Sequence, residues 1–224
     1  SDVYKRQYYT NRDPRFYLTI AKNGDEKWPN WNTVPLQTYQ GGLNAEPLSG
    51  GTPTGYYLKK YCQTAVDLRA GTASKTYHSW ITFRFGEFYL NYAEAVYKYL
   101  GSPYATDSEF TTSAVDAIKV VRTRAGMPGF PQGMTNDAFW KKYQNERMVE
   151  LAFEGHRFWD VRRWKEGDKH FKNIVEMKIT KKGDDTYTYE RKVKERSWDD
   201  KMYFFPIPQS EKSKNPNLEQ NPGW

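Results

Sequence analysis

The feature that most constrains this chain is the stretch ERMVELAFEGHRFWDVRRW at residues 146–164. Glu146, Glu150 and Glu154 follow one another at four-residue spacing, which places their side chains on one face of a helix. Gly155 then interrupts the apolar pattern, and a second helical pattern starts at His156. The stretch therefore predicts a junction between two helices, with three carboxylates stacked along the first.

Two catalytic interpretations of these residues are weak. A glycosidase needs two carboxyl groups that face each other across a substrate, whereas carboxylates stacked on one helix point the same way. Glu154 and His156 diverge by about 200° on a continuous helix, so they could share a metal only if Gly155 breaks that helix. We therefore expect no catalytic residue and no metal here.

A structural role fits the stretch better. Arginines close in sequence favour ionised, ion-paired carboxylates, and four rings are expected to lock the junction. The arginines are Arg147, Arg157, Arg162 and Arg163, and the rings are Phe153, Phe158, Trp159 and Trp164. Replacing Arg147 by alanine is expected to cost roughly 2–5 kcal/mol because it leaves buried acidic partners unpaired.

The rest of the chain divides into three parts. Residues 8–78 carry many turn signals, such as Asp13-Pro14 and Gly50-Gly51, with short strand-like pieces such as residues 16–20, and predict a loop-rich region. Residues 79–166 show helical periodicity. The predicted helices run from Phe85 to Gly101, from an Asp107 or Ser108 cap to Gly126, from Thr135 or Asn136 to Gly155, and from His156 to Trp164.

Residues 167–224 are predicted to be extended. Alternating apolar residues on both sides of a turn at 182–184 predict a β-hairpin, and the prolines between 206 and 222 predict a non-helical tail along the surface. The two helix pairs resemble degenerate tetratricopeptide hairpins. The fold class is accordingly mainly α, with helical hairpins, long irregular loops and one small β-hairpin.

Charge and composition exclude several classes of protein. The formal net charge is +7, but the 34 Lys and Arg residues are interleaved with 27 acidic residues, which argues against nucleic-acid binding. No apolar run is long enough for a membrane helix. A single cysteine, Cys62, excludes an internal disulfide, and three histidines without metal spacing argue against a metal or another cofactor.

The first seven residues, SDVYKRQ, look foreign to the rest. DVYKRQ is what a transposon-type sequencing adaptor gives when translated in one frame. We expect residues 1–7 to be an artefact of library preparation and the native protein to begin near Tyr8.

Five segments, in order along the chain, resemble landmarks of the SusD/RagB family of outer-membrane glycan-binding lipoproteins. They are DPRFYLTIAKNGD (13–25), TGYYLKKYC (54–62), FRFGEFYLNYAEAV (83–96), the stretch at 146–164, and FPIPQSEKSKNPNLEQNPGW (205–224). The signature residues within them, all given a structural role, are Arg84, Glu87, Glu94, Glu146, Arg147, Glu150, Glu154, Gly155, His156, Arg157, Asp160, Arg163 and Trp164.

The resemblance implies that residues 8–224 form the C-terminal part of such a protein, with a lipid anchor on a missing N-terminal part. It implies non-catalytic capture of oligo- or polysaccharide at the cell surface, and delivery to a SusC-like TonB-dependent transporter in the outer membrane. Some members bind peptides instead. Two other classes stay open: a glycoside-processing enzyme that uses the helix carboxylates, and a structural helical-repeat adaptor.

Sugar faces stack on aromatic rings and sugar hydroxyls bind polar side chains, so rings on loops are the candidate ligand residues. The candidates are Trp28, Asn30, Trp31, Tyr39 and Trp198. Tyr56 and Tyr57 form a weaker set, because rings in a family landmark are more readily explained as covers for the scaffold. Family ligand residues do not map onto this chain by motif.

Overall fold

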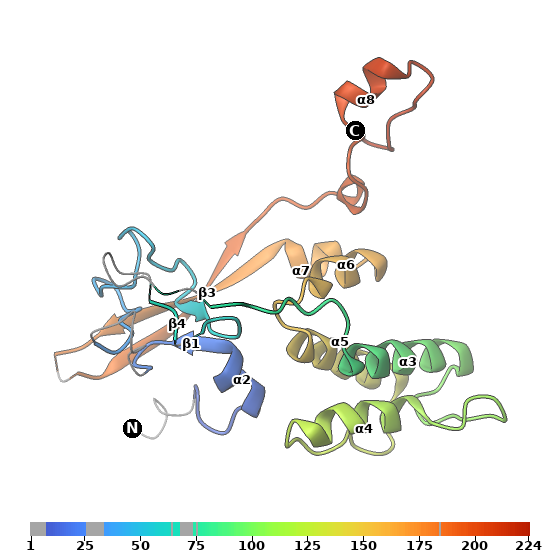
Figure 1. Cartoon of the computed structure of the whole chain (residues 1–224), viewed down its shortest axis with the longest axis horizontal. Helices are drawn as coiled ribbons and strands as arrows, with labels where there is room; N and C mark the ends of the chain where they lie inside the picture. Colours follow the sequence, from blue (N-terminus) through green and yellow to red (C-terminus); the bar gives the residue numbers. More distant parts are fainter. Residues whose placement is uncertain (1–7, 26–33, 64, 68–73, 75, 184) are drawn as a thin grey trace.

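The computed structural model of the chain describes residues 8–25, 34–63, 65–67, 74, 76–183 and 185–224. Most of the helices gather at one end of the described structure, and loops with the strands and one short helix form the other (Figure 1). The predicted class, mainly α with helical hairpins, long irregular loops and one small β-hairpin, is confirmed.

The helical end begins with α3 (Phe85–Leu100) and α4 (Ala114–Arg124), which pack side by side as a hairpin. Gly101 ends α3 in the left-handed region at φ 71°, as its position in the pattern predicts. The helices α5 (Asn136–Glu150), α6 (His156–Arg163) and α7 (Gly167–Phe171) follow. The buried core of this end comes from α3, α4, α5 and the residue after α5, and consists of Leu90, Ala93, Ala114, Val115, Ala117, Ile118, Val121, Phe139, Tyr143 and Leu151.

Two helix boundaries differ from prediction. The second helix begins at Ala114, after a Ser113 cap, because Asp107 instead accepts backbone N–H bonds from residues 109 and 110 and closes a separate turn. The third helix ends at Glu150, since the backbone leaves the helical region and reaches φ 62° at Phe153. Glu154 therefore lies beyond the helix that carries Glu146 and Glu150.

The loop end holds a helix where a strand was predicted. Pro14–Thr19 forms α2, and only Ile20–Lys22 continues as a strand, β1, paired antiparallel with β2 (Tyr56–Leu58). Asp13 caps α2 through the backbone N–H of Arg15, and Pro14 suits a first helical turn. This capping signal outweighed the strand propensity of the segment.

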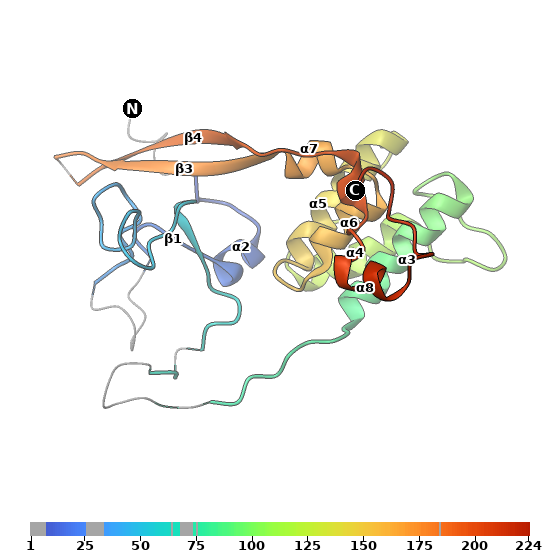
Figure 2. The same ribbon diagram turned by 90° about the horizontal axis from the view of Figure 1, so that it is seen from above.

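The predicted β-hairpin is confirmed as β3 (Asn173–Lys181) and β4 (Tyr187–Glu195). Figure 2 shows it lying along the loop end. The free edge of β3 binds those loops, because the N–H of Gln40 donates to the carbonyl of Ile179 at 2.8 Å. The N–H of Met177 likewise donates to the carbonyl of Thr54 at 3.0 Å.

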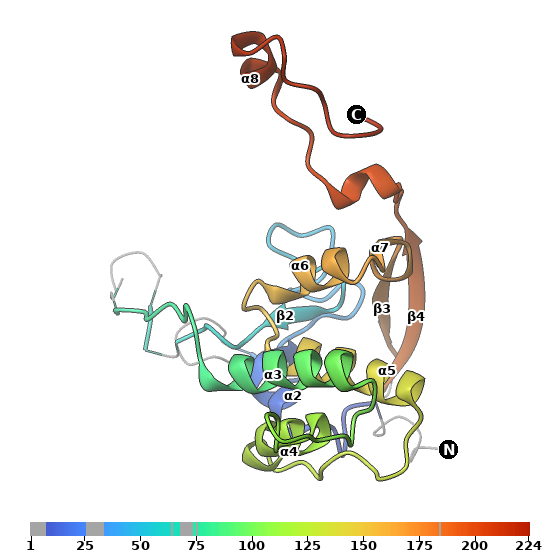
Figure 3. The same ribbon diagram turned by 90° about the vertical axis from the view of Figure 1, so that its right-hand side faces the viewer.

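The tail was predicted wrongly as non-helical. It contains a short 3-10 helix, η1 (Asp200–Tyr203), and a helix, α8 (Gln209–Lys214). Pro208 precedes α8 and Pro216 follows it, so neither proline interrupts the helix. Figure 3 shows α8 standing away from the helical end instead of lying along its surface.

Candidate functional site

The face of α5 that carries the stacked carboxylates is fully paired with cations. Glu146, 1% exposed, accepts from Arg15 at 2.7 Å and from Arg122 at 2.5 Å. Arg15 comes from α2 and Arg122 from α4. One buried carboxylate therefore holds the loop end and the helical hairpin together.

Glu150 and Glu154 extend the same network. Glu150 accepts from Arg15 at 2.8 Å, from Arg84 at 2.5 Å and from the more exposed Arg124 at 2.7 Å. Glu154 binds Arg84 at 2.7 Å and Lys60, from the loop after β2, at 2.5 Å. Burial raises the pKa of Glu154, but these two cations outweigh it and hold its pKa below the ordinary value. We call Glu146, Glu150 and Glu154 the carboxylate ladder.

Glu94 of α3 is the centre of a second buried group. Arg163 forms a two-pronged ion pair with it, the indole N–H of Trp164 donates to it at 3.0 Å, and the hydroxyl of Tyr143 donates at 2.7 Å. Burial raises the pKa of Glu94, and these donors more than compensate and lower it overall. Burial also raises the pKa of Tyr143.

The arginines close in sequence do not pair with the ladder, contrary to expectation. Arg147 donates to Asp160 at 2.6 Å, and Asp160 also contacts Arg163 at 3.0 Å. Arg157 bonds to the ring of His170, and Arg162 lies over aromatic rings. These side chains leave α5 and α6 in other directions, so the cations of the ladder come from distant segments.

Three of the four rings expected to lock the junction are exposed. Phe153, Phe158 and Trp159 are 49%, 40% and 58% exposed, and only Trp164 packs against the core. Phe158 and Trp159 instead contact Phe205, the start of the tail, with ring centroids about 6 Å apart. The turn at 151–155 directs these rings outward.

The two helices are separated by residues 151–155, with Gly155 at φ 83° before α6, so the condition for Glu154 and His156 to share a metal is met. Glu154 nevertheless turns to its cations, and His156 lies 3.6 Å from the carboxylate of Glu87. Among the residues that the structure describes, no three His, Cys, Asp or Glu side chains are placed to hold an ion.

Of the predicted ligand residues, Trp28, Asn30 and Trp31 lie outside the described residues. Tyr39 is half-buried against Tyr187, with centroids 5.5 Å apart, so it leans on the hairpin.

Trp198 packs on the scaffold. Its ring contacts Phe171 and Tyr203, with centroids 5.2 and 5.1 Å away. It lies so close to Gly167 that a Cβ on that glycine would stand 1.9 Å from the ring. Trp198 therefore seats the start of the tail on α7, and Gly167 is required for that contact.

A stacked pair of rings, one exposed and one half-buried, was missed by the sequence interpretation. Trp80, 68% exposed, stacks on Tyr61 with centroids 5.6 Å apart and planes 24° from parallel. His78 meets the Tyr61 ring edge-on, and Lys60 anchors the segment to the ladder. The two stacked rings come from different parts of the loop region, so no pattern of neighbouring residues predicts that they meet.

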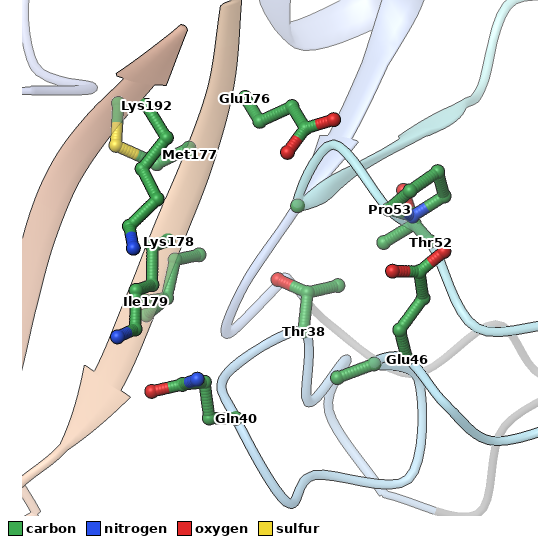
Figure 4. A pocket seen from close by; sticks show the side chains of 12 residues that line it. Thr38, Gln40, Glu46, Thr52, Pro53, Glu176, Met177, Lys178, Ile179 and Lys192 are labelled. Carbon is green, nitrogen blue, oxygen red and sulfur yellow. The ribbon is translucent and has the colours of Figure 1, made fainter. Parts of the chain in front are cut away.

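A polar pocket of about 260 Å³ lies between β3 and the loop at 38–55 (Figure 4). Its lining is Thr38, Gln40, Ala45, Glu46, Thr52, Pro53, Gly55, Glu176, Met177, Lys178, Ile179 and Lys192. The hydroxyl of Thr38 is buried and has no hydrogen-bond partner among the described residues.

The chain matches the model of the SusD family over residues 4–224. A SusD-like protein from Bacteroides fragilis shares 30% identity at a TM-score of 0.77, over 96% of this chain and 40% of that chain. A SusD-like carbohydrate binding protein from the same species shares 24% identity, at a TM-score of 0.63 over 94% of this chain and 42% of that one. A SusD homologue from Bacteroides thetaiotaomicron shares 22% identity, with a TM-score of 0.55 over 95% and 41%.

At 24% and 22% identity the last two likenesses show the fold alone. The chain spans about two fifths of the length of these solved structures. No curated protein matches it significantly. In the described part of the chain, no helix is both long and apolar enough to cross a membrane.

Proposed function

Because this chain belongs to the SusD family, we propose that it is part of a cell-surface protein that captures oligo- or polysaccharide without cleaving it. The family resemblance further implies a lipid anchor in the outer membrane and delivery of the glycan to a SusC-like TonB-dependent transporter. Both belong to the same proposal.

The observation that carries glycan capture is the Tyr61–Trp80 stack, in which the Trp80 ring is exposed. A pair of stacked rings on a loop offers a sugar an apolar face. If the loop is already held in place, binding the sugar does not have to order it. Lys60 supplies that hold, because its ammonium group binds Glu154 at 2.5 Å and the carbonyl of Ala152 at 2.9 Å. Trp28, Asn30 and Trp31 stay candidate partners for the same ligand.

The carboxylate ladder supports binding over hydrolysis. A general acid needs a raised pKa and an open position beside the substrate, whereas the pKa of Glu154 is lowered and each ladder carboxylate has at least two cationic partners. A ladder saturated in this way holds segments together. The enzyme alternative therefore lacks a free carboxyl group on this face.

The test uses the full-length protein that carries this chain, in affinity electrophoresis through gels containing starch, xylan or mannan. Trp80→Ala is expected to weaken retardation about ten-fold and to leave the melting temperature unchanged. Tyr99→Ala, which removes a ring of similar exposure on α3, is the matched control. Retardation of wild type with no change in Trp80→Ala would remove this stack from the proposal.

Two further readouts separate the alternatives. Chromatography of each polysaccharide after incubation detects shortened products, which only the enzyme alternative predicts. Co-purification with an outer-membrane transporter, together with no retardation by any glycan, would favour the structural adaptor.

A further inference from the structure

The pocket beside β3 contains a buried polar atom that has no hydrogen-bond partner among the described residues. The backbone N–H of Thr38 donates to Asn23 at 3.0 Å, but its hydroxyl has no partner in the described part of the chain. Figure 4 shows that hydroxyl directed into the space between the loop and β3, on the side of Gln40. A buried hydroxyl without a hydrogen bond is unfavourable, so the site is built for a ligand that completes it.

The charged side chains that line the pocket are also unpaired. Glu46, Glu176, Lys178 and Lys192 line it; Glu176 and Lys192 stand opposite each other in the β3–β4 hairpin, but none of the four forms an ion pair within the described residues. Two carboxylates and two ammonium groups sum to zero formal charge. They provide both acceptors and donors around one cavity, which suits a neutral molecule with many hydroxyl groups better than an anion or a cation.

The two backbone bonds that join the loops to β3 keep the pocket in shape. Gln40 binds the carbonyl of Ile179, and Thr54 accepts from Met177, so the loop is fastened to the strand on both sides of Lys178. At about 260 Å³ the cavity falls just below the ~300–1,000 Å³ typical of sites for drug-sized ligands. It therefore has room for about one sugar ring.

We propose that this pocket binds a single neutral sugar residue through hydrogen bonds to Thr38, Gln40 and Glu176. The proposal rests on the proposed glycan-binding function and adds to it a second site, without aromatic stacking, that selects uncharged sugars. The Tyr61–Trp80 stack can bind the apolar faces of many different sugars, whereas this pocket selects a sugar by hydrogen bonds to its hydroxyl groups.

The test is calorimetric titration of the full-length protein with glucose, galactose, mannose and xylose, and with glucuronic acid as the charged comparison. At least one neutral sugar should bind, and glucuronic acid should bind about ten-fold more weakly. Thr38→Val should weaken neutral-sugar binding about ten-fold without lowering the melting temperature, because it removes a hydroxyl that has no partner in the free protein. Thr188→Val, an exposed threonine on β4 outside the pocket, should change neither property.

A second variant protects the test against an unexpected change in folding. Glu176→Gln gives the lining a net positive charge, so it should bring the affinities for glucose and glucuronic acid closer together.

Neutral-sugar binding that neither variant alters, equally tight glucuronic acid, or no binding of any monosaccharide would each overturn the pocket proposal. Retardation by polysaccharide in the same preparations would show that the proposed function survives. Absence of both monosaccharide and polysaccharide binding would overturn the two proposals together.

Discussion

Glutamates at the two ends of this molecule have opposite surroundings. Each carboxylate of the ladder on and beside α5 has two or more cationic partners, contributed by α2, α4, the residue before α3 and the loop after β2. Glu46 and Glu176, at the pocket, have no ion pair within the described residues, although Lys178 and Lys192 line the same cavity. Glutamate side chains therefore join segments through ion pairs at one end of the molecule, and at the other end, within the described part of the chain, they are free of ion pairs and can bind a ligand.

The difference follows from burial. Glu146 and Glu150 are 1% and 4% exposed, so water cannot compensate their charge and arginines must. The pocket is open to water, which solvates unpaired charges until a ligand replaces it. The ladder carboxylates are thus all held in ion pairs, whereas the two pocket carboxylates have no ion pair among the described residues.

The largest expected effect on stability is the loss of one buried arginine from the carboxylate ladder. Arg15→Ala leaves Glu146 and Glu150 short of a buried partner, so the free energy of unfolding should fall by about 3–5 kcal/mol. Arg124 also pairs with Glu150, but its side chain is 62% exposed, and Arg124→Ala should cost less than about 1 kcal/mol. Denaturant titration of both variants of the full-length protein measures the contrast; equal losses would contradict it.

Low pH should lower the stability of the helical end, which is held together by ionised carboxylates. The pKa values of Glu94 and Glu154 are lowered in the fold from an ordinary value near 4.5, so their stabilisation is complete above that pH and is lost as the pH falls through the lowered values. The melting temperature should therefore drop below about pH 4.5. In Arg84→Gln, which lacks a partner of Glu154, the drop should be shallower; an unchanged slope would show that other groups control it.

The smallest expected effect concerns stability at the pocket. Glu176→Gln removes no ion pair, so the free energy of unfolding should change by no more than about 0.5 kcal/mol. The same denaturant titrations measure it. A loss of unfolding free energy as large as that of Arg15→Ala would show that Glu176 also stabilises the fold, and the two ends would then not differ in this respect.

Local patterns predicted the regular elements well. The period of apolar residues in α3, the left-handed glycine at 101 and the alternation in the hairpin are all properties of neighbouring residues, and each was recovered. Predictions failed where two local signals competed. At Asp13-Pro14 the cap overrode strand propensity, and at Pro208 and Pro216 the prolines bounded a helix where they were expected to exclude one.

The site was less predictable. Stacked glutamates at 146, 150 and 154 required cations, but the nearest arginines in sequence were the wrong ones. Trp80 meets a ring from another loop segment, and the orphan hydroxyl of Thr38 is recognisable only once β3 closes over it.

The sequence alone therefore determined the four helices between Phe85 and Arg163, the β3–β4 hairpin, the family and the need to neutralise three stacked carboxylates, because periodicity, capping and charge act over a few residues. Which arginines neutralise them, which rings stack and which polar groups stay unpaired were decided only by the tertiary structure. Those outcomes depend on burial and on contacts between ladder and pocket segments that are 24 to 140 residues apart. Chain separation of that size leaves no local trace in the amino-acid pattern.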